Sequence, residues 1–325
     1  LTDSQLQGMG RFVVDNLQLR LAPEADVSAT AWRLEGNATS RYFESLEILG
    51  QLDFATDHWN ASAAARSLEV SNLLLGLLPA DALAGILQAD TRLLCHTNLD
   101  LQLAGRLATP TAAGDGGIRL PRFEPLSGGL QAQVLDGKLE DARLPYPVGG
   151  LQATIHWDQN GLAVTDISAH CGTARLAGFY QQSATAELPE RRLKLSAYQL
   201  RVDAGLIARL PEDLQKPLTT FSPVGTVDIH WSSESGSHAD ERELVVAVHD
   251  ASFRYAKFPY ALDGAEGLIR LKNDTLTMEG FKAHAHGQAL SVVANIDQPF
   301  KQPRGWLRLA ASGPVPIDDE LMGAL

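Results

Sequence analysis

The chain has 325 residues, of which 27 are basic and 39 acidic, and its formal net charge of −12 disfavours nucleic-acid binding, because phosphates must be met by Lys and Arg. Hydrophobic residues make up 45% and charged residues 20%, which excludes both a disordered tail and a membrane bundle. No run reaches the roughly eighteen apolar residues that a membrane-spanning helix needs.

Alternation of apolar and polar residues is the dominant local pattern. Successive side chains of a strand point to opposite faces, so the pattern predicts strands with one apolar and one wet face. The apolar positions of the four clearest strands are, in chain order, Leu99, Leu101 and Leu103; Leu151, Ile155 and Trp157; Val227, Ile229 and Trp231; and Leu290, Val292 and Ile296.

Turn-forming clusters separate the predicted strands at short intervals. They are Asp136-Gly137, Gln159-Asn160-Gly161 and Lys272-Asn273-Asp274. Short connections join antiparallel neighbours. The sequence therefore predicts a mainly β fold, a long antiparallel meander whose apolar residues share one face.

Two segments have helical spacing, and we expect short helical connectors there. The first, at about 72–90, has Pro79 at a position that the first turn of a helix tolerates. The second, at about 203–218, has Asp203 as its N-cap, and Pro211 interrupts it after Leu210.

The chain matches itself at two offsets, which predicts repeated modules. Val70, Leu74, Leu78, Pro79 and Asp81 lie 132 residues before Val202, Leu206, Leu210, Pro211 and Asp213. Pro145, Tyr146, Gly150 and His170 lie 114 residues before Pro259, Tyr260, Gly264 and His284. We expect a β-rich N-terminal part at 1–67, a first module at 68–200 and a second at 201–325, with a third beginning near 306.

These repeats resemble the AsmA-like, TamB-related family of bacterial envelope proteins. The resemblance is carried by Leu210-Pro211 followed by the segment 225–231, by Phe258-Pro259-Tyr260 through Gly264, and by an earlier copy at 144–150. It covers most of residues 68–325. It implies an elongated, curved antiparallel β-sheet groove built of repeated modules with short helical connectors.

The resemblance also implies a function. Such a chain would be a non-enzymatic, bridge-like lipid-handling protein of the periplasm. It would guide phospholipid acyl chains along an apolar groove between inner and outer membrane, or support outer-membrane assembly with partners there. The inner-membrane anchor would lie outside this sequence. The twelve apolar-face positions named above are then the expected lining of the groove.

Two alternatives stay open at this point. Alternation does not separate an open groove from a closed core, so a structural or adhesive β-repeat envelope protein without a lipid ligand is the first. An enzyme, such as a glycan-active β-fold, is the second, although no repeat holds a clustered set of titratable residues of its own.

We expect no catalytic residue, metal ion or cofactor. Cys95 and Cys171 lie in different segments without CxxC spacing, which gives too few ligands for a zinc site. His284 and His286 share a strand face, but no third ligand is near them in the sequence. His170 and Cys171 are adjacent, so on a strand they point to opposite faces and do not form a nucleophile–base pair.

Overall fold

The computed structural model describes residues 14–24, 30–75, 91–108, 122–142, 144–184, 190–210, 212–236, 240–255, 258–285, 287–299 and 301–313. In this part of the chain the fold is mainly β, as the alternation predicted. The strands are β1 (Asp15–Pro23), β2 (Ala31–Ser40), β3 (Phe43–Asp53), β4 (His58–Ser71), β5 (Arg92–Ala108), β6 (Arg122–Glu140), β7 (Val148–Asp158), β8 (Gly161–Cys171), β9 (Ala174–Ser183), β10 (Arg191–Val202), β11 (Val224–Ser235), β12 (Glu241–Tyr255), β13 (Phe258–Lys272), β14 (Thr275–Ala285), β15 (Gln288–Asp297) and β16 (Arg304–Ala311).

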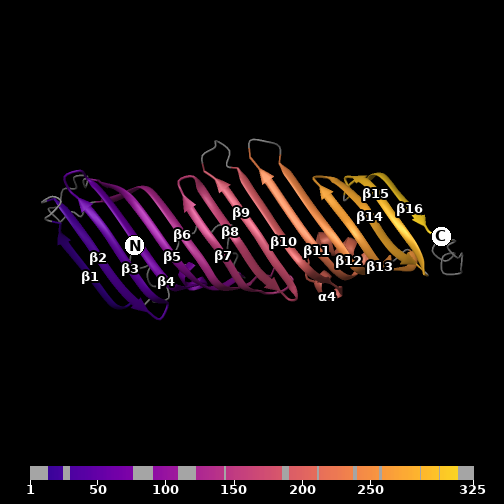
Figure 1. The fold of residues 1–325 in the computed structure, drawn as a ribbon, viewed down its shortest axis with the longest axis horizontal. Helices are drawn as coiled ribbons and strands as arrows, with labels where there is room; N and C mark the ends of the chain where they lie inside the picture. Colours follow the sequence, from indigo (N-terminus) through magenta and orange to yellow (C-terminus); the bar gives the residue numbers. More distant parts are fainter. Residues whose placement is uncertain are drawn as a thin grey trace. The chain divides into compact units, whose positions relative to one another are not determined.

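These strands belong to one sheet, and each is hydrogen-bonded to the strands before and after it in the chain (Figure 1). Neighbouring strands run antiparallel, as the short connections predicted. Strands β1 and β16 are the two edge strands of this sheet.

Contacts divide the chain into two compact units. Unit 1 comprises Leu1–Leu139, Gly150–Asp166 and Gln182–Glu187, and unit 2 comprises Glu140–Gly149, Ile167–Gln181 and Leu188–Leu325. The two units are described separately below.

Two of the three predicted turns are confirmed. Strand β7 ends at Asp158 and β8 begins at Gly161, and β13 ends at Lys272 and β14 begins at Thr275. The predicted turn at Asp136-Gly137 is wrong, because both residues lie inside β6. A Cβ added to Gly137 would lie 3.0 Å from Leu151 Cβ and 3.1 Å from Cys95 Cβ. The glycine thus serves close packing by the side chains of both neighbouring strands, and not a chain reversal.

The helical connectors are short. Helix α2 (Asn72–Leu75) follows β4, while residues 76–90 of the first predicted connector, with Pro79, lie outside the described residues. The second connector comprises α4 (Ala204–Ile207) and α5 (Glu212–Phe221), so it extends three residues beyond the expected 218. Asp203 is the N-cap of α4 as predicted, since its Oδ1 accepts a hydrogen bond of 2.9 Å from the Leu206 amide. Pro211, between the two helices, is outside the described residues.

Within unit 2, α4 is tied to the turn that precedes β7. The Arg209 guanidinium donates to the Pro145 carbonyl at 2.7 Å and lies 5.1 Å from the centroid of the Tyr146 ring. The Cys171 thiol donates to the Tyr146 carbonyl at 3.5 Å. The Pro-Tyr element therefore holds the connector against the sheet.

Matching backbone geometry recurs at the two repeat offsets. Gly150 and Gly264, separated by 114 residues, have φ of 58° and 57°. Ser67 and Gln199, separated by 132 residues, have φ of 52° and 57°, although neither is glycine. Residues other than Gly adopt this left-handed conformation at a cost, so a shared local constraint is expected at the second pair.

That constraint is a β-bulge braced by a side chain of the next strand. In unit 1 the Ser67 amide donates to Asn98 Oδ1 at 3.0 Å, and in unit 2 the Gln199 amide donates to Asp228 Oδ1 at 2.7 Å. Both amides lie where the strand register shifts, so each would otherwise lack a ladder partner. The same device precedes a helical connector in both units.

Candidate functional site

The residues predicted to line the groove lie on one face of the sheet within each unit. In unit 1, Leu99, Leu101 and Leu103 of β5 are opposite Ala65, Ala63 and Ala61 of β4. Further rows of cross-strand partners on this face run from β1 to β5. They are Leu19–Gly36–Ile48–Ala63–Leu101 and Leu21–Leu34–Gly50–Ala61–Leu103.

Strand β7 contributes to the same face of unit 1. A Cβ added to Gly128 would lie 2.9 Å from Leu103 Cδ2 and 3.5 Å from Trp157 Cζ3, so these two side chains flank one glycine. Leu151 flanks Gly137 in the same way. Ile155 alternates with its neighbours and shares the face of Leu151 and Trp157.

Unit 2 has the same arrangement. Trp231, Ile229 and Val227 of β11 and Ile296, Val292 and Leu290 of β15 all belong to apolar rows. The rows are Leu195–Trp231–Leu244–Leu271–Leu276–Ile296, Ala197–Ile229–Val246–Ile269–Met278–Ala294–Leu307, Leu200–Val227–Val248–Gly267, Phe281–Val292–Leu309 and Ala283–Leu290–Ala311. We call this set of positions in each unit the apolar face of that unit.

Burial varies along these rows. In unit 2, Val248, Phe281 and Val292 are at most 8% exposed and form the centre of a hydrophobic cluster. Towards the edge strand β16, Leu307 and Leu309 are 60% and 56% exposed. In unit 1 the edge strand β1 is similar, with Leu19 and Leu21 at 58% and 54%. Large apolar side chains of this face are therefore open to solvent within each unit, and such surface is a common mark of a binding region.

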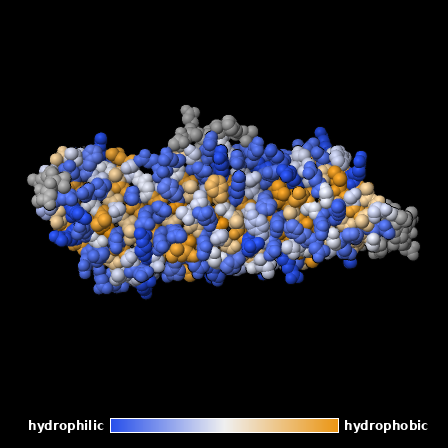
Figure 2. Space-filling view, in the orientation of Figure 1, coloured by the Kyte–Doolittle hydropathy of each residue, from blue (hydrophilic) through white to orange (hydrophobic). Residues whose placement is uncertain are grey.

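The opposite face is polar, with isolated apolar residues. Figure 2 shows one side of the molecule, on which hydrophilic side chains predominate and hydrophobic ones gather in separate patches. Leu268 pairs with Glu279 and Val293 with Arg308, which places these two exposed side chains on the polar face of unit 2. They are useful controls for any claim about the apolar face.

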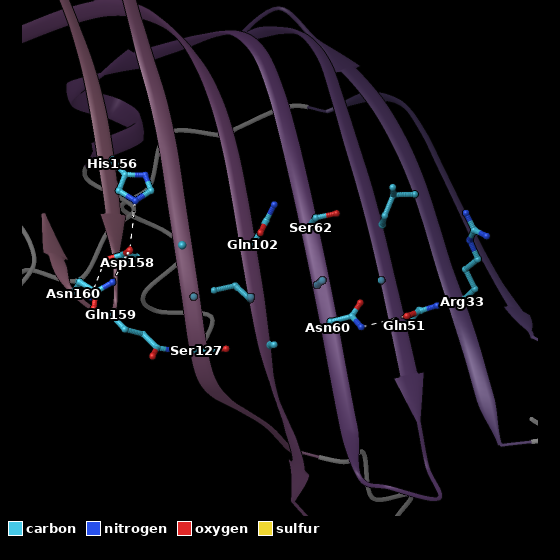
Figure 3. A pocket seen from close by; sticks show the side chains of 17 residues that line it. Arg33, Gln51, Asn60, Ser62, Gln102, Ser127, His156, Asp158, Gln159 and Asn160 are labelled. Atoms are coloured by element: carbon cyan, nitrogen blue, oxygen red, sulfur yellow. Dashed lines mark hydrogen bonds and ion pairs between the residues drawn. The ribbon is translucent and has the colours of Figure 1, made fainter. Parts of the chain in front are cut away.

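The polar face of unit 1 contains a pocket with a volume of about 800 Å³ (Figure 3). Its side chains come from β2 to β7 and the turn that follows. They include Arg33, Leu49, Gln51, Asn60, Ser62, Gln102, Ala104, Ser127, His156, Asp158, Gln159 and Asn160. Register confirms their common face, since Arg33, Gln51, Asn60 and Ala104 are successive partners, as are Leu49, Ser62 and Gln102.

Hydrogen bonds fix the two ends of this pocket. At one end Asn60 Nδ2 donates to Gln51 Oε1 at 3.2 Å, and Gln51 Nε2 donates to Glu24 Oε2 at 3.2 Å. At the other end the Asp158 carboxylate accepts from the Asn160 amide at 2.8 Å, from the Asn160 side chain at 3.1 Å, and lies 3.5 Å from His156 Nε2. These contacts, the Asn160 amide first, hold the pKa of Asp158 below its ordinary value.

Sequence reasoning did not find this pocket. Its residues come from six strands that no motif links, so nothing in the sequence singled them out as a group. The available signal was the run of neutral amide and hydroxyl residues at alternate positions, such as Asn60 and Ser62, in place of the charges that usually cover such a face.

The described residues contain no cluster of three or more His, Cys, Asp or Glu arranged to hold a metal ion. His286, one of the two histidines considered for that role, lies outside them. Burial raises the pKa of both the Cys95 and the Cys171 thiol. Among the described helices, none combines the length and apolar character needed to cross a bilayer.

No family model, curated protein or solved structure matches this chain. The function is therefore inferred from its residues and their geometry.

Proposed function

We propose that this chain is a non-enzymatic lipid-handling protein of the bacterial envelope, which guides phospholipid acyl chains along the apolar faces of its sheet. The observation that carries the proposal is the set of unbroken apolar cross-strand rows, with large side chains such as Leu21 and Leu307 more than half exposed. A sheet face of this kind must be covered by something apolar.

Acyl chains suit such a face better than a ligand with directional groups. Their transfer from water is favourable by about 0.8 kcal/mol per buried CH₂ and requires no hydrogen-bond partner. Rows of Leu, Ile, Val and Ala offer many equivalent contacts. A chain bound to them would slide from row to row without a large barrier.

The wider setting is part of the proposal and rests on the resemblance to the AsmA-like family. It places the protein in the periplasm, attached to the inner membrane through an anchor outside this sequence. Phospholipids are the ligand, and outer-membrane assembly factors are the partners. The repeated Pro-Tyr and Leu-Pro elements around Tyr146 and Leu210 support that assignment.

Photo-crosslinking in living cells tests the proposal with a matched pair of positions. Leu307 and Trp306 are neighbours on β16, are 60% and 54% exposed, and point to the apolar and polar faces respectively. We would place p-benzoyl-phenylalanine at each in turn and search the purified protein for attached lipid. Lipid at position 307 and none at 306 is expected.

Other outcomes count against the proposal. Equal labelling at both positions would mean that lipid contact is not face-selective. No lipid at either position, in protein shown to be folded, would favour the structural or adhesive β-repeat alternative, in which protein covers the apolar faces.

A further inference from the structure

The pocket on the polar face of unit 1 lies on the side of the sheet opposite to the apolar face. Asn60 and Ser62 carry their side chains on that polar face, whereas the side chains of Ala61 and Leu103, which also border the pocket, belong to an apolar row. Any ligand of this pocket is therefore separate from the acyl chains proposed above, and the two ideas succeed or fail independently.

The charged side chains around the pocket lie at its two ends, where each is paired or hydrogen-bonded. Arg33 Nε lies 2.8 Å from Glu35 Oε1, and His156 Nε2 lies 3.5 Å from Asp158 Oδ2. Arg33 is paired with Glu35, so no free positive charge is left to select a phosphate. The carboxylates of Glu24 and Asp158 lie at opposite ends of the pocket and already accept hydrogen bonds from Gln51 and Asn160. The pocket thus favours an uncharged ligand.

Between these charged pairs the lining consists of neutral donors and acceptors. In the described part of the chain, the side chains of Ser62, Gln102 and Ser127 have no hydrogen-bond partner in the protein, so their capacity is available to a ligand. An amide side chain both donates and accepts, as a sugar hydroxyl does. Leu49, 49% exposed beside Ser62, offers an apolar contact for the C–H groups of a sugar ring.

An extended peptide fits less well. Peptides that join a sheet bind to the free N–H and C=O groups of an edge strand. The strands under this pocket are interior strands whose backbone groups pair with both neighbours. The polar groups offered to the ligand here are mostly side-chain amides and hydroxyls.

We propose that the polar-face pocket of unit 1 binds a neutral oligosaccharide. The lining spans six strands, which at about 4.8 Å between neighbours extends for about 24 Å. That length suits a short chain of sugar residues and exceeds a single one. The volume of about 800 Å³ lies within the range of established ligand sites.

The test is a titration of the ¹⁵N-labelled chain with three soluble probes, namely chitohexaose, maltohexaose and a neutral Gly-Ser hexapeptide. We expect at least one glycan to shift the side-chain NH₂ signals of Gln51, Asn60 and Gln102 saturably. The variant Gln102→Met removes a donor and an acceptor at similar volume. It should weaken that binding about tenfold, the effect of roughly one or two hydrogen bonds.

Gln152→Met is the matched control. Gln152 is exposed on the polar side of the same β7 strand as His156 but does not line the pocket, so its replacement should leave the affinity unchanged. The proposal is overturned if neither glycan shifts the pocket amides, if Gln102→Met and Gln152→Met behave alike, or if the hexapeptide alone binds. The last result would reassign the pocket to peptides.

Discussion

The two units share their backbone design and differ in what each face presents. Both carry apolar rows on one face, and both contain a bulge whose amide is bound by an Asn or Asp of the next strand. On the polar face, unit 2 is covered by pairs such as Arg270–Glu243 at 2.6 Å, Lys272–Glu241 at 3.5 Å and His249–Asp228 at 3.0 Å. Unit 1 also has such pairs, Arg66–Asp100 at 2.8 Å among them, and in addition presents a pocket lined mostly by amides and hydroxyls.

The apolar faces differ as well. Strand β4 of unit 1 contributes Ala61, Ala63 and Ala65, whereas its counterpart β10 in unit 2 contributes Leu195, Ala197 and Leu200. Larger side chains let unit 2 form a buried cluster around Phe281. The sheet and its bulges leave the side-chain chemistry of each face free to vary. One backbone is therefore compatible with the two kinds of ligand proposed above.

The largest expected effect separates the two apolar faces. Phe281→Ala in unit 2, where the ring is 4% exposed, should lower the free energy of unfolding by about 3–5 kcal/mol, because a cavity is left in a packed cluster. Leu101→Ala in unit 1, at a half-buried site, should cost at most about 2 kcal/mol. Urea unfolding of both variants measures the difference.

Leu307→Ala is the control for that experiment. It lies on the apolar face of unit 2 but is 60% exposed, so the loss should be below about 1 kcal/mol. Equal losses for Phe281→Ala and Leu101→Ala would mean that the two faces are equally packed, and the comparison would fail.

A smaller effect is expected at the braced bulges. Asp228→Ala and Asn98→Ala each leave a bulge amide without its side-chain acceptor. Each variant should lose about 1–2 kcal/mol of unfolding free energy, the larger loss falling on the charged acceptor. Asn295→Ala, on the polar face of β15, should change stability by less than about 0.5 kcal/mol. If Asp228→Ala and Asn98→Ala lose no more unfolding free energy than Asn295→Ala, the hydrogen bond to the bulge amide does not stabilise the fold.

The smallest expected effect is a pH dependence of stability at the bulge bound by Asp228, which the bulge bound by Asn98 should lack. The Gln199 amide, and secondarily His249, hold the pKa of Asp228 below its ordinary value. The stabilisation is therefore complete above about pH 4, the ordinary carboxyl pKa, and is lost as the pH falls through the lower folded-state pKa. Thermal melts between pH 2 and pH 7 should show less acid destabilisation for Asp228→Asn, which keeps the acceptor oxygen. If Asp228→Asn leaves the pH dependence of the melting temperature unchanged, Asp228 is not the source of the acid destabilisation.

Much of this fold follows from the sequence. Alternation places Leu101, Ile229 and Val292 on apolar faces because strand geometry has a strict period of two, and the N-cap at Asp203 follows from local hydrogen bonding. The turn predicted at Asp136-Gly137 fails because glycine also permits close packing, and only the neighbours Cys95 and Leu151 reveal which use applies.

The bulges and the pocket could not be predicted from the sequence, because both depend on the register between neighbouring strands. Ser67 and Gln199 share an unusual backbone conformation but not a residue type, so comparison of side chains alone does not pair them. The pocket brings Arg33 of β2 together with Asp158 of β7 across four intervening strands. Local patterns assign each residue to a face and leave open which distant residues it joins there.

The proposed acyl-chain path is tested most directly by measuring which face of the sheet an acyl chain contacts. Methyl NMR spectra would be recorded with a phospholipid that carries a nitroxide on its acyl chain. We predict strong broadening of the Leu307 and Leu309 methyl signals on the apolar face. The Leu268 and Val293 signals, from side chains 45% and 38% exposed on the polar face, should persist. Equal broadening of both pairs, or none at either, would contradict the proposal that the apolar face is an acyl-chain path.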